Sequence, residues 1–148
     1  MFEKRKLNLF VFVICLSCII CSCTNKQGKK YSCSGFQDSL LHKFVYKTAD
    51  SAPQPEGGTQ AIAKLLNKNF KYPPGEAYYS GRVIVAFVVE TTGKIDGKRT
   101  IYDPSGHDHL FSKQLLDILS TIKWKPGLCN GEPVPVLYSF PLRIDIGE

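Results

Sequence analysis

Two histidines stand close together in the second half of the chain, between acidic residues. His107 and His109 are flanked by Asp103 and Asp108, and Ser105 precedes them. Imidazole and carboxylate groups can ligate metals or transfer protons. However, this run also precedes a helical pattern, where acidic and polar side chains commonly cap the first turn. The run lacks further ligands at a suitable spacing, and its serine is too near its histidine in sequence to indicate a triad.

The rest of the sequence adds no catalytic motif. It has no glycine-rich phosphate loop, no nucleophile elbow and no zinc-binding helix motif. We therefore expect a protein that is not an enzyme and that uses neither a metal nor a cofactor.

The first residues have the layout of an export signal. Lys4-Arg5-Lys6 precede an apolar run of 14 residues from Leu7 to Ile20. A helix needs roughly 20 apolar residues to span a bilayer, so this run is short for a membrane helix. A basic start followed by a short apolar core is typical of a secretory signal.

The end of the apolar run resembles a bacterial lipoprotein box. In Ile20-Cys21-Ser22-Cys23 a small residue directly precedes a cysteine, and a branched aliphatic residue lies two positions further back. We therefore predict that Cys23 carries lipid and becomes the first residue of the mature chain. The alternative is an uncleaved anchor helix that runs to about Cys23. Both interpretations place the remainder in the periplasm, held at a membrane. A lipid anchor holds because each buried acyl methylene contributes about 0.8 kcal/mol.

Composition indicates one globular domain after this segment. The chain has 148 residues, of which 43% are hydrophobic and 22% charged. Six of its nineteen basic residues, but only two of its thirteen acidic residues, lie in residues 1–42. The remaining thirteen basic and eleven acidic residues nearly balance, so we expect no nucleic-acid partner. The predicted division is a signal peptide or membrane anchor over 1–22, a tether over 23–42 and a domain over 43–148.

Only two cysteines remain once the signal and the lipidated residue are set aside. Cys33 falls in the tether and Cys129 in a late loop. Two thiols in an oxidising compartment can pair. The sequence leaves the pairing of these two open.

Two segments have apolar residues at helical spacing. The first begins at Thr59 and ends at Tyr72-Pro73-Pro74-Gly75, because proline cannot continue the hydrogen-bond ladder. The second covers about Asp108–Lys123. Their apolar stripes are Ile62, Leu65, Leu66 and Phe70 in the first, and Phe111, Leu115, Ile118, Leu119 and Ile122 in the second.

Four segments are predicted as strands. Phe44–Tyr46 is a weak first strand. Arg82–Glu90 holds seven consecutive apolar residues, so it is expected at the centre of a sheet and covered on both faces. A turn at Thr91–Lys94 leads to a more polar return strand, Ile95–Tyr102.

The last strand, Val134–Ile146, has apolar residues at its even positions. Its odd positions include Pro135 and Pro141, which have no N–H to donate. Both prolines therefore lose donors on the same side of the strand, which predicts an edge strand. The expected fold is α+β, a three-stranded antiparallel sheet backed by two helices in the order β-α-β-β-α-β.

Seven short motifs, in this order, resemble the C-terminal domain of the TonB energy transducers. They span Phe44 to Ile146, essentially the whole predicted domain. The motifs are Pro55-Glu56-Gly57-Gly58, Tyr72-Pro73, Gly81-Arg82-Val83, Thr92-Gly93-Lys94-Ile95, Trp124-Lys125-Pro126-Gly127, Gly131-Glu132-Pro133-Val134 and Tyr138-Ser139-Phe140-Pro141.

This resemblance implies a function in energy-coupled transport across the outer membrane. Such a domain binds the TonB box of outer-membrane receptors as an added strand, the mode called β-augmentation. The alternative is a lipid-anchored binding or scaffold protein that has the same fold but transduces no energy. The partner-binding residues implied are Asn69, Phe70, Lys71, Tyr72, Val136, Leu137, Tyr138, Ser139 and Phe140.

Three features depart from the family pattern. The stretch between Tyr72-Pro73 and Arg82-Val83 is short. The family's contact with inner-membrane proton-motor proteins uses a histidine in the N-terminal membrane helix, but no histidine precedes His42. The tether from Cys23 to Pro55 extends to at most about 110 Å, a short reach across the periplasm. The motor linkage therefore does not follow from the resemblance.

Overall fold

The computed structural model describes residues 33–72 and 79–146. The chain divides into two units, residues 1–30 and 31–148, and only the second contains described residues. The predicted signal, Cys23 and Tyr31 lie outside these ranges. In the described part, no helix combines the length and apolar character required to cross a bilayer.

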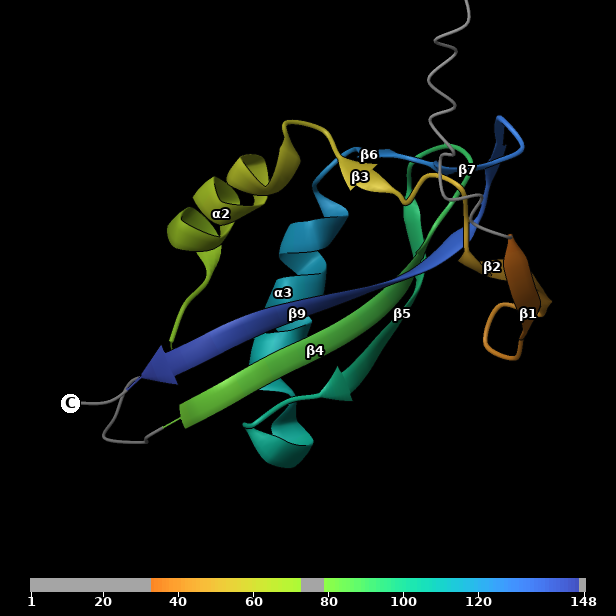
Figure 1. Ribbon diagram of the computed structural model, residues 1–148. Helices are drawn as coiled ribbons and strands as arrows, with labels where there is room; N and C mark the ends of the chain where they lie inside the picture. Colours follow the sequence, from red (N-terminus) through yellow and green to blue (C-terminus); the bar gives the residue numbers. More distant parts are fainter. Residues whose placement is uncertain (1–32, 73–78, 147–148) are drawn as a thin grey trace, which may run out of the picture. The chain divides into compact units, whose positions relative to one another are not determined.

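The main sheet has five strands, in the spatial order β1-β2-β9-β4-β5 (Figure 1). The prediction of three strands is therefore wrong, because the segment Cys33–Thr48 adds a hairpin to one side. All neighbours in the sheet are antiparallel except β2 and β9, which are parallel. The strands are β1 Ser34–Asp38, β2 Lys43–Thr48, β4 Tyr79–Val89, β5 Ile95–Tyr102 and β9 Val136–Ile146.

Two helices and several short elements connect these strands. Helix α2 covers Gly58–Asn69 and helix α3 covers Leu110–Ser120, close to the predicted segments. A 3-10 turn over Gly106–Asp108 precedes α3. Two small sheets were not predicted: β3 Gln54–Pro55 pairs with β6 Trp124–Lys125, and β7 Gly127–Cys129 pairs with β8 Glu132–Val134.

Strand β4 lies in the middle of the fold, as its unbroken apolar run predicts. It pairs with β9 on one side and with β5 on the other. Its odd-numbered valines and Phe87 pack against the helices, in one core with Phe111 and Leu115 of α3. On the opposite face Ala86 and Val88 are also buried. The central part of β4 is therefore covered on both faces and paired on both edges.

Trp124 belongs to this core. It is 3% exposed, and its ring lies against Phe87 and Tyr138 with both pairs of ring centroids 5.3 Å apart. Its backbone also closes the β4–β5 turn, since its N–H donates to the carbonyl of Gly93. Gly93 has a φ of 79°, and a Cβ there would meet the Trp124 carbonyl oxygen. A glycine is needed at this position for both reasons.

Ion pairs fix the β1–β2 hairpin to Arg99 of β5 and to Glu90, which follows β4. The buried carboxylate of Asp38 accepts hydrogen bonds from Arg99 of β5 at 2.8 Å and from the N–H groups of Leu40 and Leu41 in the hairpin turn. Lys43 pairs with Glu90 at 2.7 Å. Residues 34–42, expected to be tether, therefore form a strand and its turn. The cause is contact with β5, a partner distant in sequence.

One of the acidic residues near the two histidines, Asp103, caps the start of helix α3. Asp103 is buried, and its carboxylate accepts hydrogen bonds from the N–H and hydroxyl of Ser105 and from the N–H of Ser112. The Ser105 hydroxyl oxygen in turn accepts the N–H of Leu110. His107 and His109 are exposed. The run Asp103–His109 thus serves the helix start, as its position in the sequence indicated.

Both buried carboxyl groups make stability depend on pH. Burial alone would raise the pKa of Asp38, but hydrogen bonds from Arg99 and two amides outweigh it and hold that pKa below the ordinary value. At Asp103 burial acts in the same direction, and hydrogen bonds from Ser105 and Ser112 likewise leave the pKa lowered. Groups with a lowered folded pKa stabilise the fold above their unfolded pKa of about 3.9 and lose this contribution as the pH falls through the folded pKa.

We expect the free energy of unfolding to decrease as the pH is lowered from about 5 to 2. Urea unfolding at several pH values measures this change. In Asp103→Asn the decrease should be smaller, because one of the two carboxyls is gone, and stability at pH 7 should fall by about 1–3 kcal/mol. Asp108→Asn, at an exposed carboxyl, is the matched control. An unchanged pH dependence in Asp103→Asn would contradict this account.

Candidate partner-binding edge

Strand β9 is paired along its whole length on one side only. Eleven register pairs with β4 run without a break from Val89↔Val136 to Tyr79↔Ile146. On its other side β2 makes a single register pair, Tyr46↔Val136. The prediction of an edge strand is thus wrong at the start of β9. Beyond Leu137, no strand within residues 33–72 and 79–146 covers this side.

The backbone groups on that side can be identified. The Tyr46 N–H donates to the carbonyl of Pro135 at 2.9 Å, so the odd positions point their backbone groups toward β2 and the even positions toward β4. Past the β2 contact, the odd positions are Ser139, Pro141, Arg143 and Asp145. We call the side of β9 formed by their N–H and C=O groups the open edge.

The open edge explains how a proline fits inside a long strand. Pro141 lies opposite Ile84 of β4. Because Pro141 is an odd position, its missing N–H faces the open edge and no bond to β4 is lost. The edge therefore offers N–H donors at Ser139, Arg143 and Asp145, and a carbonyl acceptor at each of the four positions.

The side chains of β9 alternate as its sequence pattern predicts. Tyr138, Phe140 and Leu142 are partly buried against the core beneath the helices, while Ser139 and Pro141 are exposed on the other face. Of the predicted partner-binding residues, Ser139 directs its backbone to the open edge. Tyr138 and Phe140 direct theirs to β4 and line the edge with side chains only. Val136 is 4% exposed and Leu137 half-buried, where β2 closes the edge.

The second predicted group begins at Asn69, the last residue of α2, and continues beyond the helix through Phe70 to Tyr72. Asn69 ends the helix and its side-chain amide donates to the carbonyl of Leu65. Phe70 packs against the same core as Tyr138 and Phe140, so both predicted groups border one core. Tyr72 is 54% exposed and stacks edge-on against Phe70, with ring centroids 5.5 Å apart.

Gln114 of α3 holds this segment in place. Its side-chain oxygen accepts the N–H of Lys71 at 2.9 Å, and its side-chain nitrogen donates to the Lys71 carbonyl at 3.0 Å. This pair of bonds imitates a β-bridge and engages both backbone groups of Lys71. The segment therefore offers a partner its side chains rather than the Lys71 backbone. The role of Gln114 was not predicted, because a polar residue on a helix does not indicate a hydrogen-bond partner 43 residues away in sequence.

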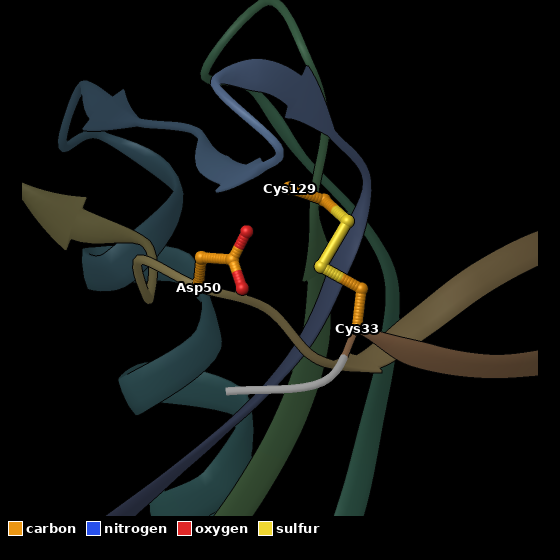
Figure 2. Close-up of side chains that lie close together, drawn as sticks. All are labelled: Cys33, Asp50 and Cys129. Atoms are coloured by element: carbon orange, nitrogen blue, oxygen red, sulfur yellow. A yellow bond between two sulfur atoms is a disulfide. The ribbon is translucent and has the colours of Figure 1, made fainter. Parts of the chain in front are cut away.

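The two cysteines whose pairing the sequence left open form a disulfide. Cys33 is bonded to Cys129, across 96 residues of sequence (Figure 2). The carboxylate of Asp50 lies beside the bond and accepts the N–H of Asn130 at 2.7 Å. Of the described residues, only these three have potential metal-ligand atoms within 4.8 Å of one another. The disulfide engages both sulfur atoms, so no thiolate is left there to bind a metal.

Fold and edge together define an α+β domain, in which a sheet packs against two described helices and leaves one interior strand partly unpaired. Comparison with known proteins agrees with this class. The family model for the C-terminal region of the Gram-negative bacterial TonB protein matches residues 68–145, just over half of the chain. The chain belongs to this family of non-enzymatic binding modules, whose members interact with outer-membrane proteins.

A search of curated proteins finds no match. Among solved structures, the chain is similar to the solution structure of the C-terminal domain of TonB from Pseudomonas aeruginosa, at 14% identity and a TM-score of 0.39. That similarity covers 78% of this chain and 96% of the other.

Removal of the Gln114 side chain should release the segment that follows α2. In Gln114→Ala the Lys71 N–H loses its acceptor, so its hydrogen exchange should accelerate roughly tenfold, and the fold should lose about 1 kcal/mol. Lys113→Ala, at the preceding exposed position of the same helix, is the control. Amide exchange followed by NMR gives both values. Unchanged exchange at Lys71 would show that the two Gln114 hydrogen bonds do not hold the segment.

Proposed function

We propose that this domain binds the TonB box of outer-membrane receptors by adding it as a strand to the open edge of β9. The observation that supports this most directly is the row of outward backbone groups from Ser139 to Asp145, which has no strand partner in the described chain. An unpaired edge of this kind attracts an extended peptide, because its donors and acceptors are already aligned.

The ends of the open edge limit where an added strand can lie. At its start, the Tyr46↔Val136 pair places β2 in the line that the added strand would follow. On the helix side, the segment from Phe70 to Tyr72 presents an exposed aromatic ring. Backbone pairing would supply affinity, and the side chains of Phe70, Tyr72 and Phe140 would supply selectivity.

Pro141 interrupts the ladder that an added strand can form. A partner residue opposite Pro141 receives no N–H donor from the edge. A strand bound to Ser139–Asp145 therefore lacks one hydrogen bond at this position, although the Pro141 carbonyl can still accept one. One missing hydrogen bond weakens binding by about 0.5–1.5 kcal/mol, so we expect modest affinity for an isolated peptide.

We further propose that the domain works at a periplasmic membrane surface. The basic and apolar N-terminal segment and the Cys23 box support this location. If the bound strand is also pulled, the domain supports receptor-dependent transport. Binding without any effect on transport would instead indicate a lipid-anchored scaffold.

Two assays together test the proposal. Immobilised peptides that carry TonB-box sequences should retain the protein, whereas the same peptides in scrambled order should not. Deletion of the gene should abolish growth that depends on receptor-mediated uptake of iron complexes or cobalamin. Peptide retention with normal growth would select the scaffold function, and no retention would rule out box binding.

Backbone substitutions at the open edge provide the sharper binding test. Ser139→Pro removes an outward N–H without touching a bond to β4, and should weaken peptide binding about two- to tenfold. Ser139→Ala changes only the side chain and is the matched control. Pro141→Ala restores a donor and should tighten binding by a similar factor. Titration calorimetry measures the three affinities, and equal values for all three would exclude binding at this edge.

Mass spectrometry of the exported protein tests the anchor. We expect a mature chain that begins at acylated Cys23, and Cys23→Ala should abolish acylation and leave the precursor uncleaved. Cys21→Ala should not, because Cys21 precedes the cleavage site. A product that retains the apolar segment Leu7–Ile20 in the presence of Cys23 would identify an anchor helix instead.

A further inference from the structure

The disulfide lies where the N-terminal segment enters the fold. Cys33 is the residue before β1, and Cys129 is the last residue of β7. Only residues 130–135 separate Cys129 from β9. The bond therefore gives the covalent chain a short route from the N-terminal segment to the strand with the open edge, and this route leaves out residues 34–128.

The two routes into the domain differ in how firmly they are held. Strand β1 is one of the two outermost strands of the main sheet and pairs only with β2, over five register positions. Apart from Asp38 its residues are exposed. Tension that enters at Ser34 would separate these pairs one after another from the end. Strand β9 is held by eleven pairs with β4 and by side chains that pack into the core.

Cys129, the second residue of the disulfide, is held firmly in the domain. Cys129 is 7% exposed and packs with Val134 and Val136. The neighbouring Leu128 exchanges two backbone hydrogen bonds with Ser51, at 3.0 and 3.1 Å. Figure 2 shows Asp50 beside the bond, and its carboxylate holds the Asn130 amide in the turn that follows. A pull on Cys33 therefore reaches a well-supported hairpin rather than a loose loop.

We propose that the Cys33–Cys129 bond is a mechanical strap, which carries tension from the N-terminal segment directly to β8 and β9 and keeps it off the β1–β2 hairpin. The use of such a strap in a cell rests on the proposed function, in which a strand bound to β9 is pulled from the membrane side. The mechanical property itself depends only on the bond and on the unequal support of β1 and β9.

Optical-trap extension of single full-length molecules tests the strap. The chain carries a handle at each terminus, and detergent keeps the apolar N-terminal segment in solution. The disulfide-bonded chain should first yield at the higher force needed to release β9. Cys33→Ser/Cys129→Ser should yield first at a clearly lower force, with a short extension that corresponds to β1 and β2. Its complete extension should exceed that of the bonded chain by roughly 35 nm, since 96 residues are no longer held in the loop.

The loss of any disulfide that closes a loop would lengthen the complete extension. Only the force of the first event therefore tests whether the bond acts as a strap. Asp38→Asn weakens the attachment of the hairpin to β5. It should leave the first-event force of the bonded chain unchanged and lower that of the serine double variant. Equal first-event forces with and without the bond would overturn the strap, and so would a lower force for Asp38→Asn in the bonded chain.

Two controls keep the result interpretable. If the serine double variant does not fold, the natural chain is folded first and then reduced by a dithiol in the trap, which opens the same bond. Peptide binding is measured separately in the absence of force. The expected difference in first-event force, without peptide binding, would refute the proposed function and leave the strap. Peptide binding without that force difference would overturn the strap and leave the proposed function.

Discussion

The eleven-residue pairing of β4 with β9 is the interaction on which the rest of the structure depends. An apolar strand such as β4 needs partners on both edges and cover on both faces. Strands β9 and β5 supply the partners, and α2, α3 and Trp124 complete the core on one face. One edge of β9 pairs with β4 along its whole length. On the other edge only the first residue pairs with β2, so the rest of that edge stays open. The candidate binding surface is thus a consequence of how the core is built.

Pro141 and the Cys33–Cys129 bond determine how many donors β9 offers at its open edge and how the N-terminal segment is joined to it. Pro141 reduces the number of outward donors without loss to the ladder with β4, a feature that natural sheets use to discourage unwanted pairing. The Cys33–Cys129 bond attaches the incoming chain near the start of the same strand. The proposed binding edge and the attachment of the incoming chain therefore both involve β9, which is what a domain would need if a bound strand is to be pulled.

Periodicity in the sequence predicted the elements that have a continuous apolar side. Helices α2 and α3, the β4–β5 hairpin and the alternating β9 all follow from it, as does family membership from the motifs around them. Strand β1 did not follow, because Ser34-Gly35-Phe36-Gln37-Asp38 has no buried alternation and owes its place to Arg99 and Cys129. The Gln114–Lys71 contact and the β2–β9 pair were missed for the same reason. Each depends on residues far apart in sequence, whose meeting only the folded chain determines.

Amide hydrogen exchange along β9 in the free protein shows whether the outer edge of this strand is unpaired. We expect alternation: slow exchange at Tyr138, Phe140, Leu142 and Ile144, which donate toward β4, and fast exchange at Ser139, Arg143 and Asp145 on the open edge. Uniformly slow exchange from Tyr138 to Asp145 would mean that another segment already covers this edge. The domain would then have no free strand to offer a partner.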